Sequence, residues 1–492
     1  MATEYISTKE AERQNGFIKE NRKLLGTGKL FHIITFGCQL NDNDSEKLAG
    51  LCEAMGMQMT GRPEAADLVI INTCSVRENA AGRFFGNLGI IKNLQKDKPE
   101  RLVVVCGCMM KQDVHVDKIR RSYPFVDILF GPADIYRFPE LLNRRLQGSR
   151  RVYDVGSIDT VAENIPIKRE RKYRALCTIM YGCNNFCSYC IVPYARGRER
   201  SRRQSEIMTE LKQLAAEGYS EVMLLGQNVN SYGKDLPASD EQGDFVDLLT
   251  QAAEESGLKR IRFMTSHPKD VSPALIDTIA RYPNIERHLH LAVQSGSDRI
   301  LKAMNRKYTA GHFLNIVREA REKVPGISVT TDIIVGYPGE TEEDFEATLK
   351  LVKEAAFDQA FTFQYSPRPG TPAAKLEEIA PEVMTERFER LVAVQNENSL
   401  RSNQALLNTE QEVLIEGLSD HNAESLTGRD SAYHLINFTV PESVYKAEGL
   451  ESASAAERGL ALEGRFARVR IHEARSFSLQ GELSALLPEG EA

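Results

Sequence analysis

The stretch "RALCTIMYGCNNFCSYC" (Arg174–Cys190) joins an apolar run to three cysteines that lie within eight residues. The apolar run predicts a buried β-strand, and the glycine and asparagines that follow predict a loop. In parallel α/β sheets, ligands and functional groups gather at the carboxyl ends of the strands. We therefore expect Cys183, Cys187 and Cys190 to form one group at the end of such a strand.

This strand is the first of six predicted strands that alternate with helical patterns. Their sequences are "RALCTIMYGC", "EVMLLGQNV", "RIRFMTS", "HLHLAVQSGS", "ISVTTDIIVGYPGE" and "AFTFQYSPRPGT". Each strand but the last precedes a helix-length segment, as in parallel βα units. Because a closed barrel of this type needs eight units, the sequence predicts an incomplete (βα)6 barrel over residues 173–400, with its chemistry at the carboxyl ends of the strands.

A second series of α/β units precedes the barrel, over residues 29–150. The β-rich runs "FHIITFGC", "DLVIINTC", "RLVVVCGC" and "DILFG" alternate with helix-length segments and predict a parallel sheet with helices on its faces. The first three runs each end in a cysteine, so Cys38, Cys74 and Cys108 are expected to converge at one edge of the sheet. We interpret residues 1–28 as a charged tail and residues 151–172 as a polar linker.

Residues 401–492 follow a different pattern, in which short β-rich runs are separated by turn residues. The runs are "EQEVLIEGL", "LINFTV" and "ARVRIHEA", and they predict a small all-β barrel. The segment "PESVYKAEGLESASAAERGLALEG" between the last two runs is expected to be an exposed insertion. The fold class predicted for the whole chain is α/β, with an all-β domain at the C-terminus.

The composition excludes several classes of protein. No apolar run approaches the roughly twenty residues that cross a bilayer, and the first residues lack the apolar centre of a secretory signal. We expect a cytoplasmic protein with no membrane partner. Because the net charge is −7, any contact with RNA must depend on a local basic patch.

Nine cysteines in a chain without an export signal indicate metal or redox chemistry, because a reducing compartment disfavours disulfides. A structural zinc site needs four closed ligands, whereas each cysteine group here supplies three. A four-iron cluster normally takes four thiolates, so three thiolates leave one iron open to bind another molecule.

The other three cysteines have simpler interpretations. Cys52 and Cys177 lie in apolar segments and are expected in the core. Cys106 lies two residues before Cys108 and is an alternative member of the first group, but the position of Cys108 at the strand end favours Cys108.

Several motifs together resemble the radical S-adenosylmethionine (SAM) methylthiotransferases. They are "TFGCQLNDNDSE", "NTCSVREN", "CGCM", "GCNNFCSYCIVPYARGRERSR", "LGQNVNSYG", "VQSGSDRILKAMNRKYT", "TDIIVGYPGETEEDF" and "YSPRPGTPA". The resemblance extends from about Phe31 to the end of the chain. It implies an N-terminal methylthiotransferase domain, a central radical SAM barrel and a C-terminal β-barrel of the TRAM type.

The resemblance also implies the cofactors and the reaction. Cys183, Cys187 and Cys190 would hold a [4Fe–4S] cluster whose open iron binds SAM, with Tyr189 as the aromatic residue of the motif. Cys38, Cys74 and Cys108 would hold a second [4Fe–4S] cluster. The implied reaction is methylthiolation of C2 of N6-isopentenyladenosine at position 37 of tRNA, and it consumes two SAM molecules. It also needs an electron donor, such as a flavodoxin or ferredoxin, and a source of sulfur.

Within the family, "NTCSVRE" and "PYARGRERSR" resemble the branch that modifies isopentenylated adenosine. The residue after the second cysteine is Ser75, whereas the branch that modifies a ribosomal-protein aspartate commonly has Gly there and the threonylcarbamoyladenosine branch commonly has Thr. Those two substrates stay as alternatives. A non-catalytic RNA-binding protein with structural clusters is a further alternative, although a structural cluster should be fully ligated.

Polar residues at the predicted strand ends are candidates for SAM binding, because ligands gather at that face of such a barrel. They are Gly226, Gln227, Gln294, Ser295 and Asp332. The alternative is that they only cap strands and turns.

Arginines after the second cysteine group are candidates for RNA contact, because the guanidinium group binds phosphates and stacks on bases. They are Arg196, Arg198 and Arg200, within a run that continues to Arg202 and Arg203. The alternative is a solvated loop. In the C-terminal barrel, "GRDSAYHLINF" (Gly428–Phe438) replaces the more basic sequence of relatives, so we expect the central domain to provide the main RNA contact.

Overall fold

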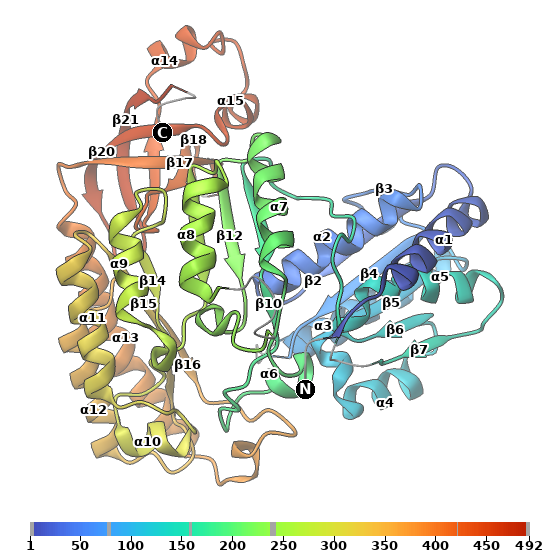
Figure 1. Ribbon diagram of the computed structural model, residues 1–492, viewed down its shortest axis with the longest axis horizontal. Coiled ribbons are helices and arrows are strands. Elements are labelled where there is room, and N and C mark those ends of the chain that lie inside the picture. Colours follow the sequence, from blue (N-terminus) through green and yellow to red (C-terminus); the bar gives the residue numbers. More distant parts are fainter. Residues whose placement is uncertain (1–3, 76–79, 157–159, 237–242, 421, 489–492) are drawn as a thin grey trace.

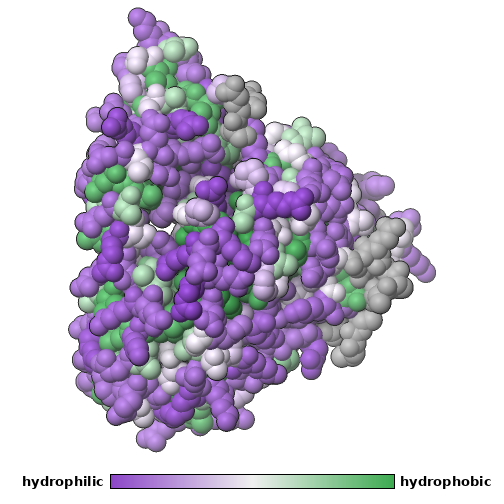
Figure 2. Space-filling model, turned by 60° about the vertical axis from the view of Figure 1, so that its left-hand side comes forward, coloured by the Kyte–Doolittle hydropathy of each residue, from purple (hydrophilic) through white to green (hydrophobic). Residues whose placement is uncertain are grey.

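The computed structural model describes residues 4–75, 80–156, 160–236, 243–420 and 422–488. Three regions follow one another along the chain (Figure 1): a sheet domain in blue, a barrel in green and yellow, and a smaller barrel in red. Hydrophilic residues cover most of the face seen in Figure 2, and apolar residues form small scattered groups on it. Among the described residues, no helix is both long and apolar enough to cross a membrane.

The N-terminal domain contains a six-stranded sheet in the order β3-β2-β4-β5-β6-β7, with every neighbouring pair parallel. Its strands are β2 (Leu30–Thr35), β3 (Gln58–Met59), β4 (Leu68–Thr73), β5 (Leu102–Gly107), β6 (Ile128–Phe130) and β7 (Val152–Asp154). Its helices are α2 (Gln39–Ala54), α3 (Ala80–Asp97), α4 (Asp113–Ser122) and α5 (Phe138–Leu146), with 3-10 turns η1 (Cys108–Lys111) and η2 (Pro132–Arg137). Alternate residues of β4 enter the two cores on opposite faces of the sheet, as its fully buried sequence predicts.

The structure differs from the prediction at both ends of this domain. The predicted tail contains β1 (Glu4–Tyr5) and α1 (Thr8–Leu25), which lies against α5. The charge-rich composition of α1 obscured the helix, which packs only Ile18 and Leu25 against the core and is otherwise held by polar contacts. The Asn21 amide donates to Pro139 O at 2.8 Å, and Asn143 Nδ2 donates to Asn21 Oδ1 at 3.0 Å. The predicted linker supplies β7 to the sheet and β8 (Thr160–Val161), which pairs with β1.

The central region has the six predicted strands in two parallel sheets, β13-β12-β9 and β14-β15-β16. The strands are β9 (Arg174–Thr178), β12 (Glu221–Leu225), β13 (Arg260–Met264), β14 (His288–His290), β15 (Ser328–Val335) and β16 (Gln359–Gln364). Single bridges, such as Ser266 to Leu291, join the two sheets. Within the described residues β9 and β16 do not pair with each other, so the barrel is incomplete as predicted.

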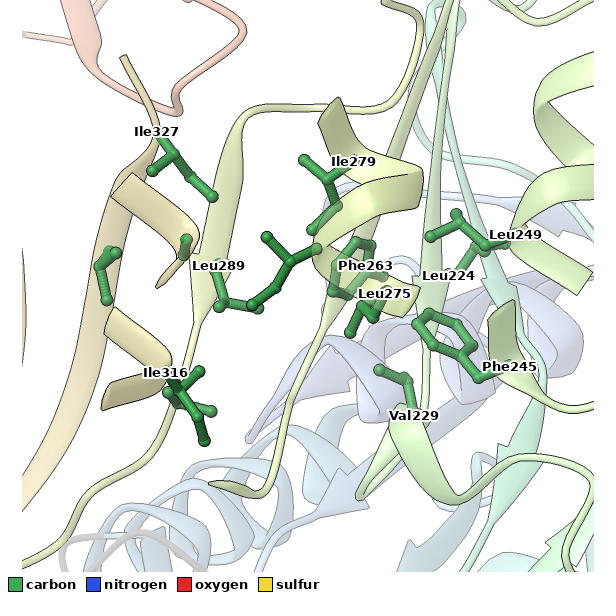
Figure 3. Packing of buried hydrophobic residues seen from close by; sticks show 14 of the residues in the cluster. Leu224, Val229, Phe245, Leu249, Phe263, Leu275, Ile279, Leu289, Ile316 and Ile327 are labelled. Atoms are coloured by element: carbon green, nitrogen blue, oxygen red, sulfur yellow. The ribbon is translucent and has the colours of Figure 1, made fainter. Parts of the chain in front are cut away.

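Helices cover the outside of this barrel (Figure 1). They are α7 (Gln204–Ala216), α8 (Phe245–Glu255), α9 (Pro273–Arg281), α10 (Asp298–Ala303), α11 (Ala310–Lys323), α12 (Glu342–Ala355) and α13 (Pro381–Gln404). Figure 3 shows Leu224 and Phe263 of the strands against Leu249 of α8 and Leu275 of α9. Shorter elements are β10 (Met180–Tyr181), α6 (Val192–Arg196), β11 (Arg200–Ser201), η3 (Val229–Ser231), η4 (Pro268–Asp270) and η5 (Ala373–Lys375).

The C-terminal region is a closed barrel in the order β17-β18-β19-β21-β20. Its elements are β17 (Glu410–Ser419), β18 (Asn422–Arg429), β19 (Leu435–Thr439), α14 (Glu442–Ala447), α15 (Ala455–Leu462), β20 (Phe466–Ala474) and β21 (Leu479–Leu486). The predicted exposed insertion contains α14 and α15. It is only partly exposed, because Tyr445 and Leu462 are buried in the core of the small barrel.

Candidate active site

Three strand ends of the N-terminal sheet bring Cys38, Cys74 and Cys108 around one cavity of about 260 Å³. Cys38 precedes α2, Cys74 follows β4, and Cys108 opens η1 after β5. Cys106 instead packs in the core on one face of the sheet, because it lies within β5. The cavity is also lined by Ser75 and by residues of the barrel domain. Residues 76–78 of the "NTCSVRE" motif lie outside the described residues.

Glycines before two of these cysteines permit the close approach of the strand ends. Gly107 has φ +100°, and a Cβ atom there would lie 2.4 Å from Thr73 O. Gly37 has φ +136°, and a Cβ atom there would lie 2.9 Å from Cys74 Cβ. Only glycine adopts such backbone angles without strain. The two "GC" pairs therefore place Cys38 and Cys108 beside Cys74.

Arg196 connects this cavity to the barrel domain. Its side chain is buried, with 4% exposed, and its Nε donates to Cys108 Sγ at 3.1 Å. Its Nη2 donates to Asp44 Oδ2 at 2.7 Å and to Asn41 Oδ1 at 3.0 Å, both on α2. Burial raises the pKa of the Cys108 thiol to about 12, and the Arg196 charge opposes that rise.

The second cysteine group lies in the loop between β10 and α6. Cys187 Sγ accepts a hydrogen bond from Arg306 Nη1 at 3.5 Å. Asn305 Nδ2 donates to Asn185 O at 3.2 Å and to Phe186 O at 3.0 Å, which fixes the loop on the residues after α10. Burial and then the neighbouring thiols raise the pKa of Cys190 to about 12. The three thiols of this group are therefore close enough to interact electrostatically.

The donor set of each cysteine group is three thiols, one fewer than a closed structural zinc site or a fully ligated four-iron cluster has. In a four-iron cluster each thiolate would bind a different iron. Cys38, Cys74 and Cys108 line one cavity together with Arg196, so the donors of this group fit such a cluster.

The candidate SAM residues take different positions. Gln227 lines the cavity of Cys38, Cys74 and Cys108. Gly226 leaves no room for a side chain, because a Cβ atom would lie 2.7 Å from Met180 Cγ. Gln294 has φ +69° and its backbone N–H donates to Asp332 O at 2.8 Å. Asp332 Oδ2 lies 3.3 Å from His290 Nε2.

Ser295 has a structural position that differs from the expected ligand role. Its side chain is fully buried, and its hydroxyl oxygen lies 3.3 Å from Thr348 Oγ1. It also accepts the backbone N–H of Ser297 at 3.2 Å. These contacts hold the start of α10 against α12.

The arginine run is mostly buried, which corrects the expectation that Arg196 and Arg200 contact RNA. Arg200 donates to two backbone carbonyls, at 3.1 Å to Arg196 O and 3.0 Å to Arg198 O. Arg202 forms ion pairs at 2.7 and 2.8 Å with Glu163 and Glu210. The spacing of the run could not reveal these contacts, because it does not show which arginines fold inward onto backbone carbonyls and carboxylates.

Arg198 is exposed and lies beside two aromatic rings. Its guanidinium carbon is 5.1 Å from the centre of the Phe186 ring. Phe186 makes an edge contact with Tyr194 at a centroid distance of 6.1 Å, and Tyr194 is 43% exposed. We call Phe186, Tyr194 and Arg198 the aromatic patch.

The sequence did not indicate that the polar residues of α2 and Arg306 belong to the site. Residues Leu40, Asn41 and Asn43–Cys52 of α2 are all buried, although this part of the helix includes several charged residues. Asn43 Nδ2 donates to Leu176 O at 3.0 Å on β9, so α2 lies between its own sheet and the open edge of the barrel. Helix α2 packs its apolar residues Leu48, Leu51 and Cys52 in the core of the sheet domain, whereas its polar first half, "NDNDSEK", is buried through hydrogen bonds and ion pairs that hydropathy does not register.

Comparisons with known proteins agree with this architecture. The Radical SAM superfamily model matches residues 177–352, the TRAM domain model matches residues 404–484, and the model described as Uncharacterized protein family UPF0004 matches residues 30–131. The radical SAM methyltransferase TsrM from Kitasatospora setae has a similar fold, with TM-score 0.53 and 16% identity over 70% of this chain and 75% of that chain.

Two relatives are similar over nearly their whole length, and both are named tRNA-2-methylthio-N(6)-dimethylallyladenosine synthase. The relative from Alkaliphilus oremlandii is 47% identical over 97% of this chain and 98% of its own. The relative from Acetivibrio thermocellus is 45% identical over 97% of each chain. The chain therefore belongs to the tRNA methylthiotransferases of the radical SAM superfamily, enzymes whose cofactors are SAM and iron–sulfur clusters.

Proposed function

We propose that the protein methylthiolates C2 of N6-isopentenyladenosine at position 37 of tRNA, with two [4Fe–4S] clusters and two SAM molecules. The observation that carries this proposal is that residues next to the second cysteine group line the cavity of the first group. Ile191, Val192 and Ala195 directly follow Cys190 in the chain, and they line the cavity of Cys38, Cys74 and Cys108. Two groups of three thiolates, each one short of a full set, therefore lie on adjoining segments.

The target is an unactivated C–H bond, which acid–base chemistry does not open. Cys183, Cys187 and Cys190 would hold a cluster that provides the electron for reductive cleavage of SAM, and Cys38, Cys74 and Cys108 would hold a cluster with an open iron for the sulfur. The chain's own residues position these groups and exclude water. Arg196 and Arg306 contribute to positioning, because Arg196 donates to the Cys108 sulfur and Arg306 donates to the Cys187 sulfur.

SAM would be held by residues at the carboxyl ends of the barrel strands. Gln227, Gln294 and Asp332 remain candidates, and Gly226 would let the ligand approach the backbone closely. Ser295 is not among them, because its contacts are internal.

The aromatic patch is the candidate contact for the anticodon loop. Unpaired bases stack on aromatic rings and guanidinium planes, and the patch offers both beside the cluster loop. Arg198 keeps the RNA role expected from the sequence, whereas Arg196 and Arg200 do not.

The reaction also needs an electron donor, such as a flavodoxin or ferredoxin, and a sulfur source. The test is anaerobic incubation of cluster-loaded protein with reductant, SAM, a sulfide salt and tRNA that carries isopentenyladenosine. Mass spectrometry should detect 2-methylthio-N6-isopentenyladenosine and 5′-deoxyadenosine. Modification of threonylcarbamoyladenosine tRNA or of a ribosomal protein instead would overturn the substrate assignment. Absence of 5′-deoxyadenosine would favour a non-catalytic RNA-binding protein.

A further inference from the structure

A second cavity, of about 430 Å³, lies between the N-terminal domain and the barrel domain. Its polar lining comes from α2, η2, β10 and the segment after Cys190, and includes Asp44, Lys47, Tyr136, Tyr181, Arg196 and Arg200. Arg196 also lines the cavity of Cys38, Cys74 and Cys108. One side chain thus belongs to the walls of both cavities.

Lys47 is the unusual group in this second cavity. Its side chain is 6% exposed, and its ammonium donates to the Tyr181 hydroxyl at 3.0 Å. Asp44, one turn earlier on α2, forms its ion pair with Arg196 at 2.7 Å. Within the described ranges, no carboxylate lies within ion-pair distance of Lys47; burial lowers the pKa of Lys47, but the Tyr181 hydroxyl and the more distant Asp44 charge make the net shift upward. A buried ammonium is costly unless a negative charge accompanies it.

We infer that this cavity binds a small sulfur monoanion, hydrosulfide, and holds it next to the cysteine cavity as the sulfur source. This inference rests on the proposed function, because that reaction consumes one sulfur atom for each product. A single negative charge would match the one ammonium that lacks a carboxylate. Apolar side chains such as Ile135 and Ile165 complete the lining of the cavity. Such a lining suits a weakly hydrated monoanion better than phosphate or sulfate, because these ions carry more charge that must be desolvated.

Hydrosulfide would bind in this cavity without forming a covalent bond to the protein. Hydrosulfide binds there through charge-assisted hydrogen bonds from Lys47 and the Tyr181 hydroxyl, so no oxidant or reductant is required for this step. Arg196 lines both cavities, and its guanidinium donates to Asp44 of α2 and to the Cys108 sulfur.

A crystallographic experiment tests the site in the cluster-loaded protein. Crystals are soaked anaerobically with hydroselenide, the heavier homologue of hydrosulfide, and selenium is located by anomalous scattering. We expect a peak beside Lys47 Nζ in the wild-type protein and no peak there in Lys47→Met. Selenium only at the cysteine cavity, or elsewhere on the surface, would overturn the inference.

A kinetic experiment separates this inference from the proposed function. The hydrosulfide concentration that gives half-maximal methylthiolation should rise about tenfold in Lys47→Met, which loses one charged hydrogen-bond donor, and should recover in Lys47→Arg. Iron content should equal that of the wild type. An unchanged hydrosulfide dependence would overturn the anion site alone. Absence of methylthiolated tRNA with the wild-type protein would overturn the proposed function.

Discussion

Arg196 unites three elements through one planar side chain. Its guanidinium reaches Cys108 after β5 and both Asn41 and Asp44 on α2, while its backbone ends α6. A guanidinium suits this position because its donors have fixed directions and it stays charged when buried. The position of the first cysteine group relative to the loop between β10 and α6, which contains the second group, therefore depends on this residue.

The first prediction concerns Arg196→Met. The change leaves Asp44 buried without its cation, so the free energy of unfolding should fall by about 3–5 kcal/mol. Iron should fall from about eight to about four atoms per chain, because only the cluster at Cys183, Cys187 and Cys190 is retained. Chemical denaturation and iron analysis measure these effects. Arg203→Met changes an exposed arginine of the same run that lies over the Tyr5 ring, and it should lower stability by about 1 kcal/mol at most. Equal iron content in both variants would contradict the role of Arg196.

The second prediction concerns Tyr194 of the aromatic patch. Tyr194→Ala should weaken tRNA binding by about 1–3 kcal/mol, the usual loss when one base loses its aromatic partner. Tyr194→Phe keeps the ring and should bind like the wild type. Fluorescence anisotropy with an anticodon stem-loop measures both affinities. Equal binding by the Ala and Phe variants would remove the aromatic patch from the RNA contact.

At the scale of elements, the loop between β18 and β19 joins the small barrel to the large one. Tyr433 stacks on His288 at the start of β14, with a ring separation of 4.9 Å and an angle of 11°. Arg262 of β13 donates to Asp430 O at 3.3 Å and to Glu221 at 2.6 Å. Tyr433 and Asp430 of the segment "GRDSAYHLINF" therefore attach the small barrel to β13 and β14 of the large barrel, at whose end the small barrel lies (Figure 1). The segment has a structural role in this contact.

The third prediction is a pH dependence of this contact. Burial alone lowers the pKa of His434, but the Asp430 carboxylate, 2.8 Å away, outweighs it and the net shift is upward. Burial would raise the pKa of Asp430, and His434 makes the net shift downward. The His434 contribution to stability is complete below about pH 6.5 and is lost as pH rises through its raised pKa. The Asp430 contribution is present above about pH 3.9 and is lost as pH falls.

The stability difference between wild type and His434→Gln should therefore be largest between about pH 4 and pH 6.5. Denaturant titrations at several pH values measure this difference. A difference that stays constant from pH 4 to pH 9 would show that the His434–Asp430 pair does not stabilise this loop through charge.

The sequence predicted the strands because their apolar runs are local and periodic, and the glycines of Gly37–Cys38 and Gly107–Cys108 marked two strand ends. It could not predict the partners of Arg196 or Arg202, because an arginine run is the same in sequence whether it faces solvent or buried carboxylates. Helix α1 was missed for a related reason: Asn21 binds through its amide, and hydropathy patterns do not register such contacts.

At the scale of the whole molecule, the N-terminal domain and the barrel domain meet at the cavity of Cys38, Cys74 and Cys108. The N-terminal domain supplies Cys38, Cys74 and Cys108, and its helix α2 contacts β9 at the open edge of the barrel. The barrel supplies the second cysteine group and the aromatic patch. The C-terminal barrel attaches to β14 of the large barrel through Tyr433. This division implies that the two cysteine groups have separable tasks.

The fourth prediction separates those tasks. Cys187→Ala should produce neither 5′-deoxyadenosine nor methylthiolated tRNA, because its own cluster is needed to split SAM. Its iron content should be about four atoms per chain. Liquid chromatography measures the two products, and iron analysis measures the iron content of the protein. Substantial 5′-deoxyadenosine from this variant would contradict the assignment of SAM cleavage to the second cysteine group.

The most direct measurement is the pair of products made by Cys74→Ala after anaerobic loading with iron and sulfide. With reductant, SAM and isopentenylated tRNA, this variant should still release 5′-deoxyadenosine, because Cys183, Cys187 and Cys190 are intact, but the tRNA should gain no methylthio group. Methylthiolated tRNA from Cys74→Ala would contradict the account, since the sulfur would then not depend on the cluster held by Cys38, Cys74 and Cys108.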